Sequence, residues 1–187
     1  MRMFVAVDLD DSTKAAIARE QQMAWRLAAK APIKFVNPEQ AHLTLAFLAD
    51  VPSLQCDRLI DAMHQPVGGI APFQMTFGGL GVFPPRGAPR VLWLGVLEGA
   101  RQLIALQRAV AARLLGLGLP LEDRPFHPHL TLGRWRQARP SDRPVLPDDA
   151  RSTGATTVDR VTLYESRLSS EGPTHIARAH ALLNVEL

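Results

Sequence analysis

The chain has 187 residues, of which 47% are hydrophobic and 21% charged, and this balance is ordinary for one globular domain. Its single cysteine excludes an internal disulfide framework and a zinc site built on several thiolates. The formal charge of +3, with 18 arginines among 21 basic residues, allows an anionic partner but fits a bias of genome composition equally well. No apolar run approaches the roughly 20 residues of a membrane helix, and no signal peptide is visible, so we expect a cytoplasmic protein that does not enter a membrane.

The first third of the chain predicts strands and helices in alternation. Residues 2–9 are apolar and bounded by acids, which predicts a strand. Residues 10–30 start with capping side chains at Asp10 and Ser12 and continue with apolar residues among polar ones, which predicts a helix. A strand at 32–36, a turn at Asn37–Pro38, a strand at 42–48 and a helix at 53–65 follow.

The rest of the chain predicts more strands around one further helix. Strand-like stretches at 72–79 and 91–97 are separated by a loop rich in glycine and proline. Residues 99–117 predict a helix, because leucine and valine recur at helical spacing up to a GLGLP stop signal. Several neighbouring strands have no crossover helix between them, so we predict an α+β fold with mostly antiparallel sheets. The remaining strands are predicted at 129–134, 155–168 and 175–185.

One internal repeat carries chemistry, because the tetrapeptide HLTL occurs at 42–45 and again at 129–132. Each copy follows a lead-in with a proline and begins an apolar extended run after a strand, a helix and a strand, so the two halves of the chain resemble duplicates of one unit. Residues two apart share a face of a strand, and each His/Thr pair therefore points one way and each leucine pair the other. If the halves pack about a pseudo-twofold axis, both His/Thr pairs line one cleft.

Such a cleft suits the hydrolysis of a phosphodiester. One neutral imidazole removes a proton from water while an imidazolium opposite protonates the leaving oxygen, and histidine serves both roles because its unperturbed pKa is about 6.5. The hydroxyls of Thr44 and Thr131 donate to the non-bridging oxygens, so we expect no metal and no other cofactor. An isolated histidine in a strand is more often structural, but His42 and His129 in matching contexts favour function. The residues alone leave open which of the two is the acid.

The paired motifs resemble those of the 2H phosphoesterases. The similar branch is the bacterial RNA 2′,3′-cyclic phosphodiesterases, historically described as 2′-5′ RNA ligases. The resemblance covers nearly the whole chain, through FVAVDL, HLTLAFL, RVLWLGV, RPFHPHLTLGR and VTLYESRLSSEG. It implies one bilobal domain over residues 1–187, in which two pseudo-twofold-related antiparallel-sheet lobes with flanking helices enclose a cleft.

The same resemblance implies a phosphoric diester hydrolase that opens the 2′,3′-cyclic phosphate end of an RNA or nucleotide to a 2′-phosphomonoester. It makes His42 the proton donor and His129 the proton acceptor, without a metal, and we expect a monomer. Ligation through a 2′-5′ linkage reverses the same chemistry, and the concentration of water favours hydrolysis. A third hypothesis, an RNA-binding module without catalysis, predicts more aromatic residues and more positive charge than the 6% and +3 found here.

Arg134 lies three residues past Thr131 and faces away from His129 on an ideal strand. It reaches a phosphate only if a bulge or the strand's end turns it round, so substrate contact and an exposed salt bridge are both open. Further arginines border the proline-rich connection that follows, and we favour their contact with an RNA backbone over a solvated loop; they are Arg136, Arg139, Arg143 and Arg151.

Phe126 and Tyr164 are candidates to stack on a base of the substrate, although aromatic residues in apolar surroundings more often belong to the core. His127 forms an H-x-H pair with His129, but the intervening proline and the lack of a nearby carboxylate or thiolate argue against a metal site. The other histidines have no matching partner and are predicted to be structural or exposed; they are His64, His175 and His180.

Overall fold

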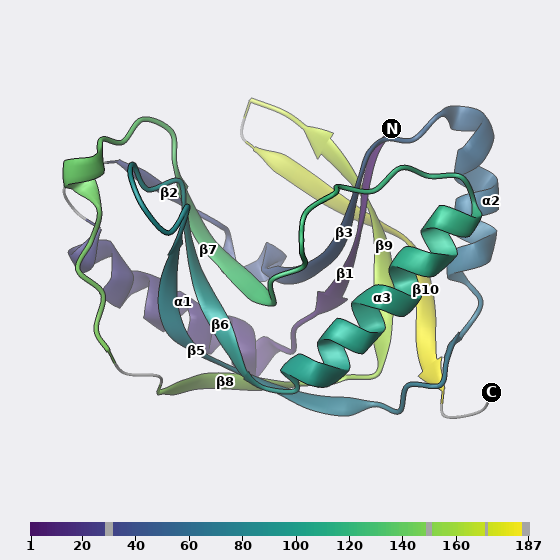
Figure 1. The fold of residues 1–187 in the computed structure, drawn as a ribbon, viewed down its shortest axis with the longest axis horizontal. Helices are drawn as coiled ribbons and strands as arrows, with labels where there is room; N and C mark the ends of the chain where they lie inside the picture. The colour runs from purple at the N-terminus through teal and green to yellow at the C-terminus, as the bar shows by residue number, and fades with distance from the viewer. Residues whose placement is uncertain (29–31, 149–150, 171, 185–187) are drawn as a thin grey trace.

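The computed structural model describes residues 1–28, 32–148, 151–170 and 172–184 of the chain. The elements in these ranges form two sheets with helices on their outer sides (Figure 1). In chain order they are β1 (Arg2–Asp8), α1 (Asp11–Leu27), β2 (Ile33–Phe35), the 3-10 helix η1 (Pro38–Gln40), β3 (His42–Asp50), α2 (Ser53–Met63), β4 (Val67–Gly68), β5 (Phe73–Phe83), β6 (Val91–Glu98), α3 (Ala100–Gly116), β7 (His129–Trp135), the 3-10 helix η2 (Pro140–Asp142), β8 (Ser152–Val158), β9 (Arg160–Leu168) and β10 (Pro173–Asn184).

The described strands form two five-stranded sheets, with the orders β3-β1-β9-β10-β4 and β2-β7-β6-β5-β8. Every neighbouring pair is antiparallel except β10 with the two-residue β4. The predicted α+β class with antiparallel sheets is therefore confirmed. The sheets are not the two halves of the chain, because β2 joins the second sheet while β9 and β10 return to the first. The two halves of the chain thus exchange strands between the sheets.

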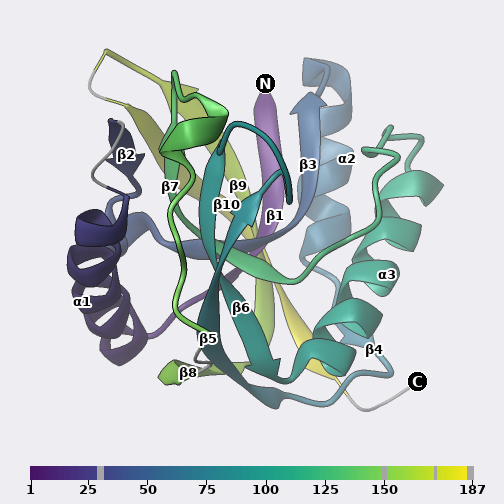
Figure 2. The ribbon, with the colours of Figure 1, turned by 60° about the vertical axis from the view of Figure 1, so that its left-hand side comes forward.

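Each sheet carries helices on one side (Figures 1 and 2). Helix α1 packs on β8 of the second sheet, whereas α2 packs on β9 and β10, and α3 on β3, of the first sheet. Asp10 caps α1 as predicted, because its carboxylate accepts a hydrogen bond of 2.7 Å from the backbone N–H of Thr13. The Thr13 hydroxyl in turn donates to the carbonyl of Ala155 at 2.7 Å, which fastens the start of α1 to β8. No helix within the described ranges is long and apolar enough to cross a membrane.

The leucines of both HLTL copies lie in a hydrophobic core that includes residues of both sheets. Leu43, Leu130 and Leu132 are 0% exposed and Leu45 is 3% exposed. The histidine and threonine of each copy are half-buried on the other face of the same strands. The predicted division of each motif between a core face and a polar face is confirmed.

Some boundaries differ from the predicted ones. Strand β5 runs four residues past its predicted end at 79 into the Gly/Pro-rich stretch, because glycine lets the backbone approach other groups there. A Cβ atom on Gly81 would lie 2.0 Å from the ring of Trp93, so only glycine leaves room for this indole on the sheet. The strand predicted at 155–168 is two strands that belong to different sheets and meet at Asp159. The predicted ends of the first helix, at residues 29–30, and of the last strand, at residue 185, lie outside the described residues.

We expect Leu130→Ala to lower the free energy of unfolding by about 2–5 kcal/mol, because it removes a buried side chain and leaves a cavity beside both sheets. The matched control is Leu115→Ala on α3, whose leucine is 58% exposed, and it should change stability by less than about 0.5 kcal/mol. Urea denaturation of both variants measures the difference. Equal losses would contradict the assignment of the HLTL leucines to the core.

Candidate active site

His42 stands at the first position of β3, directly after the turn η1. Asn37 prepares this turn, because its side chain accepts a hydrogen bond from the backbone N–H of Glu39 at 3.1 Å. The Nδ1 atom of His42 lies 2.8 Å from the carbonyl oxygen of Gln40. A carbonyl only accepts, so Nδ1 carries the proton of this bond, and Nε2 is the atom left for chemistry.

His129 repeats this arrangement at the first position of β7. Its Nδ1 atom lies 2.7 Å from the carbonyl oxygen of His127, again two residues earlier in the chain. Pro128 fixes the backbone between them, as the proline-containing lead-in suggested. Both imidazoles are therefore held in the same tautomer by their own lead-in, and both present Nε2.

The histidine and threonine of each HLTL copy form one half-site, and the two half-sites meet where the two sheets meet. Strand β3 is the edge of the first sheet, and it lies against β7 of the second sheet in the middle of the molecule (Figures 1 and 2). The positive charge of Arg134 lowers the pKa of His42 and also that of His129. The charge of this one guanidinium therefore acts on both imidazoles.

A β-bulge turns Arg134 towards the face that carries Thr131. In the pairing of β6 with β7, Trp93 lies opposite Thr131 and Val91 lies opposite Arg134, with a register shift between the two pairs. Val91 and Trp93 are two residues apart and share a face, so their partners also share one. The sequence analysis required a bulge or the end of the strand to turn Arg134 towards a phosphate, and the structure has this bulge.

The same bulge occurs in β3 and brings forward a residue that the sequence analysis missed. Phe4 lies opposite Phe47 and Ala6 lies opposite Thr44, again with a register shift between the pairs. Phe47 therefore shares a face with Thr44 and His42. Its side chain is 48% exposed, an unusual position for a phenylalanine. The signal was present in the repeat, since Phe47 follows His42 at the same offset at which Arg134 follows His129.

Each imidazole packs against two aromatic rings and a second histidine, and the other ring is Tyr164 for His42 and Trp93 for His129, each at 6.2 Å. His42 stacks on Phe4, with ring centroids 4.7 Å apart, and meets His175 edge-on at 5.1 Å. His129 meets the ring of Phe83 edge-on at 5.1 Å and lies 6.2 Å from His127. The structure thus brings His175 to the site, although the sequence predicted a structural or exposed role for it.

A partly buried polar network lies beside His42 and is centred on Asp8, the residue opposite His42 in the pairing of β1 with β3. The Asp8 carboxylate accepts hydrogen bonds of 2.5 Å from the hydroxyls of Thr162 and Tyr164. The Thr162 hydroxyl has one proton, which goes to Asp8, so it accepts at 2.8 Å from Nδ1 of His180. Asp8 lies inside the strand predicted at residues 2–9, and no local pattern in the sequence distinguishes it.

The electrostatics of the two histidines differ. Burial lowers the pKa of His42 to about 4, and the charges of His175 and Arg134 act in the same direction, whereas the Asp8 carboxylate raises it. Burial also lowers the pKa of His129, where the charges that act are those of His127 and Arg134. Both imidazoles are therefore neutral at pH 7 in the free protein, and a negative charge acts on His42 alone of the two.

The hydroxyls of Thr44 and Thr131 make no hydrogen bond to any described residue and are half-buried on the faces of His42 and His129. Phe126, in contrast, is partly buried against the hydrophobic core, which gives no support to base stacking. Within the described residues, no three side chains of histidine, cysteine, aspartate or glutamate gather in a group suited to a metal ion.

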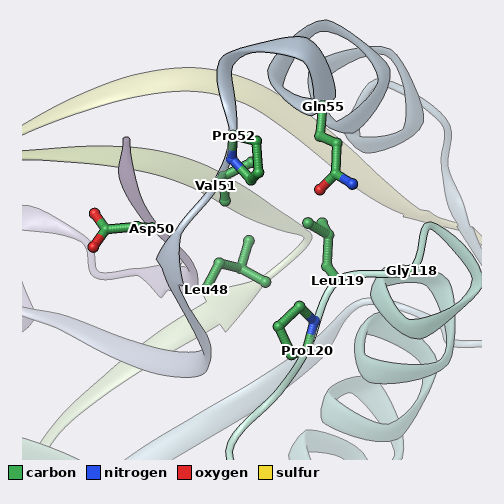
Figure 3. Close-up of a pocket in the computed structure, with 8 residues that line it drawn as sticks. All are labelled: Leu48, Asp50, Val51, Pro52, Gln55, Gly118, Leu119 and Pro120. Atoms are coloured by element: carbon green, nitrogen blue, oxygen red, sulfur yellow. The ribbon is translucent and has the colours of Figure 1, made fainter.

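A cavity of about 240 Å³ lies at the other end of β3 from His42 (Figure 3). Leu48, Leu119 and Pro120 face one another across it, and the carboxylate of Asp50 points away from them. Its lining includes neither HLTL copy. This cavity is therefore separate from the two histidines.

Known proteins share both the sequence and the fold of this chain. An RNA 2′,3′-cyclic phosphodiesterase of Archaeoglobus fulgidus is 34% identical over 176 residues, which are 94% of this chain and 96% of that protein. One of Geobacillus stearothermophilus is 36% identical over 185 residues, but this chain spans only 57% of its length. The crystal structure of TT0787 of Thermus thermophilus superposes with a TM-score of 0.79 at 29% identity over 100% of both chains.

Escherichia coli LigT in complex with 3′-AMP has a TM-score of 0.71 at 28% identity, over 97% of both chains. The model of one family, the 2′-5′ RNA ligase superfamily, matches residues 11–169. The match includes both HLTL copies and the strands that carry Arg134 and Phe47, so the resemblance found in the sequence is confirmed. With most of its length matched and its fold shared, the chain belongs to the 2′-5′ RNA ligase superfamily.

Proposed function

We propose that the protein hydrolyses the 2′,3′-cyclic phosphate end of RNA to a 2′-phosphomonoester, with His42 as general acid and His129 as general base. The observation that carries this proposal is the matched pair of imidazoles, each held through Nδ1 by a carbonyl two residues earlier and both acted on by Arg134. The name shared by the relatives, RNA 2′,3′-cyclic phosphodiesterase, supports it.

In the proposed reaction, Nε2 of His129 takes a proton from a water molecule as the water oxygen bonds to phosphorus. The bond from phosphorus to O3′ breaks, and the proton on Nε2 of His42 moves to O3′. The products are a free 3′-hydroxyl and a 2′-phosphate. Negative charge gathers on the non-bridging oxygens meanwhile, and the hydroxyls of Thr44 and Thr131 and the guanidinium of Arg134 stabilise it. Every proton and charge has a protein group, so the step requires no metal.

The family resemblance gives this division of labour between the histidines, and one feature of their surroundings, the carboxylate of Asp8, supports it. A general acid must hold a proton when the substrate is bound, and Asp8 raises the pKa of His42. A general base must be neutral, and burial, together with the charges of His127 and Arg134, keeps the pKa of His129 low. Burial leaves His42 neutral in the free protein at pH 7. We propose that the anionic phosphate raises the pKa of His42 on binding, so that His42 takes up a proton when the substrate is bound.

Phe47 is placed to hold the base of the terminal nucleotide. Its half-exposed ring shares a face with His42 and Thr44, and Phe4 supports it at a centroid distance of 6.2 Å. A base that stacks on this ring is recognised by its π-face, so the proposed site tolerates every base.

The chain is further proposed to act as a single domain and a monomer in the cytoplasm. The core that includes residues of both sheets supports one domain, and the buried, unpaired Cys56 suits a reducing compartment.

His42→Ala and His129→Ala should each lower kcat by roughly 10²–10⁴-fold, the usual contribution of a general acid or base. The double variant should lose much less than the product of the single losses, because both groups act in one displacement. The assay follows the end group of an RNA with a 2′,3′-cyclic phosphate, with EDTA present throughout. Circular dichroism controls for folding. A folded His42→Ala variant with near-normal turnover, or activity that EDTA abolishes and zinc or manganese restores, would falsify the mechanism.

The pH profile of kcat/KM should be a bell with both limbs below pH 6.5 and the lower one near pH 4, since it reports the free protein, where the pKa values of both histidines are lowered. The profile of kcat should lie at higher pH, because the bound phosphate raises both pKa values. A flat kcat/KM profile between about pH 3 and 7 would leave no place for two titrating histidines.

Asp8→Asn removes the charge that raises the pKa of His42, so the descending limb of the kcat profile should move to lower pH and turnover at pH 7 should fall. Tyr164→Phe removes a hydrogen bond to Asp8 without changing its charge and should leave that limb in place. Asp11→Asn, at an exposed carboxylate on α1, controls for net charge. An unmoved limb in Asp8→Asn would show that Asp8 has only a structural role.

Phe47→Ala should raise KM by roughly 5- to 150-fold, which corresponds to the loss of one base stack of about 1–3 kcal/mol. Phe47→Tyr keeps the ring and should keep KM. Steady-state kinetics on 2′,3′-cyclic nucleotides measure both variants. If Phe47→Ala keeps the wild-type KM, the base does not stack on this residue.

A further inference from the structure

A second cavity, of about 350 Å³, opens at the far end of β7 from His129. The residues just before β6 and just after β7 line it, and among them are Arg90, Trp135, Arg136 and Gln137. The backbone N–H of Trp135 donates to the carbonyl of Arg90 at 3.0 Å, which ties the two walls together. The cavity is thus a fixed feature of the sheet end.

The lining of this cavity carries two positive charges and no acid. Arg90 and Arg136 are exposed, and neither forms an ion pair or a hydrogen bond through its side chain with another described residue. Trp135 is 5% exposed, and its indole N–H has no acceptor among the described residues. Unpaired guanidinium groups beside the amide of Gln137 suit an anion, and phosphate is the anion that arginine binds with two parallel hydrogen bonds.

Positive charge connects this cavity to the active site. Arg134 acts on both histidines and is the residue before Trp135 on β7. Lys34 lies opposite Arg134 in the pairing of β2 with β7. Cations therefore follow one another at the end of β7, between the two histidines and the cavity.

The arginines after β7 do not all have the same role. The guanidinium of Arg143 donates to the carbonyl oxygens of Gly87, at 3.1 Å, and Pro84, at 2.6 Å. It thereby holds the loop that forms one wall of the cavity. Arg136 has no such partner in the described part of the chain, so it is available to a ligand.

The distance from His129 to the cavity limits which ligand can contact both. Six residue steps separate His129 from Trp135, and at about 3.3 Å per residue they span roughly 20 Å. A single nucleotide at the histidines does not reach that far. We propose that this cavity is a second subsite, in which Arg90 and Arg136 bind backbone phosphates of RNA upstream of the cyclic end. This inference rests on the proposed function.

The test compares a 2′,3′-cyclic mononucleotide with RNA oligonucleotides of increasing length that end in the same cyclic phosphate. For the wild type, kcat/KM should rise with length by roughly tenfold or more once the RNA reaches the cavity, as expected for charge-assisted hydrogen bonds. Arg90→Ala/Arg136→Ala should lose this rise and keep the mononucleotide rate. The salt dependence of log kcat/KM on the longest RNA should flatten by about 0.7 for each phosphate that the variant no longer binds.

Arg101→Ala/Arg108→Ala on the exposed surface of α3 removes the same charge elsewhere and should keep the full rise. The subsite is refuted by a wild type without any rise, by a cavity variant that keeps it, or by an equal loss on the mononucleotide and the long RNA. A wild type inactive on every cyclic phosphate would instead refute the proposed function. Fluorescence anisotropy of labelled RNA then tests the cavity by itself, and equal affinity of wild type and cavity variant would overturn the subsite.

Discussion

The site depends on one hydrogen bond that the chain makes twice, from Nδ1 of a histidine to the carbonyl oxygen two residues earlier. Each bond contributes only about 0.5–1.5 kcal/mol to stability. Its larger effect is on chemistry, because it fixes the tautomer and turns Nε2 away from the backbone. The turn η1 sets the carbonyl for His42, and Pro128 constrains the one for His129. If either lead-in relaxed, the ring could rotate and the pair would no longer face one phosphate.

The two motif strands have the same backbone geometry, but the charged residues beside the two histidines differ. Both motif strands have a bulge after the threonine, and the bulge brings the fifth residue after the histidine onto the polar face. That residue is Phe47 in one strand and Arg134 in the other, so one half-site offers a ring and the other a charge. Asp8 adds a carboxylate beside His42 only. The two histidines thus have equivalent geometry and differ in the charges around them, because only His42 has a carboxylate among those charges.

The sequence predicts the local part of this structure well. The boundaries of most strands and helices follow from periodicity and capping, and the burial of Leu43 and Leu130 follows from the two-residue period of a strand. The repeat identifies both histidines, because identical strings in matching contexts carry information that a single histidine lacks. The family resemblance supplies the lobes and the order of acid and base.

What the sequence does not predict depends on pairing between distant strands. The bulges exist only in register with β1 and β6, so the face of Arg134 and the role of Phe47 cannot be read from one strand alone. Asp8 reaches Thr162 and Tyr164 across 154 and 156 residues of chain. The exchange of β2, β9 and β10 between the sheets also arises only on folding.

The central claim is that two imidazoles present Nε2 to one phosphate and gain proton affinity from it. Long-range proton–nitrogen NMR spectra of the histidine side chains, recorded over a pH titration with and without a 2′-nucleotide, test this most directly. We expect the Nδ1–H tautomer for both His42 and His129 in the free protein at pH 7, and a rise in the pKa of His42 when the nucleotide binds. An Nε2–H tautomer at either residue, or titration curves that the nucleotide leaves unchanged, would contradict it.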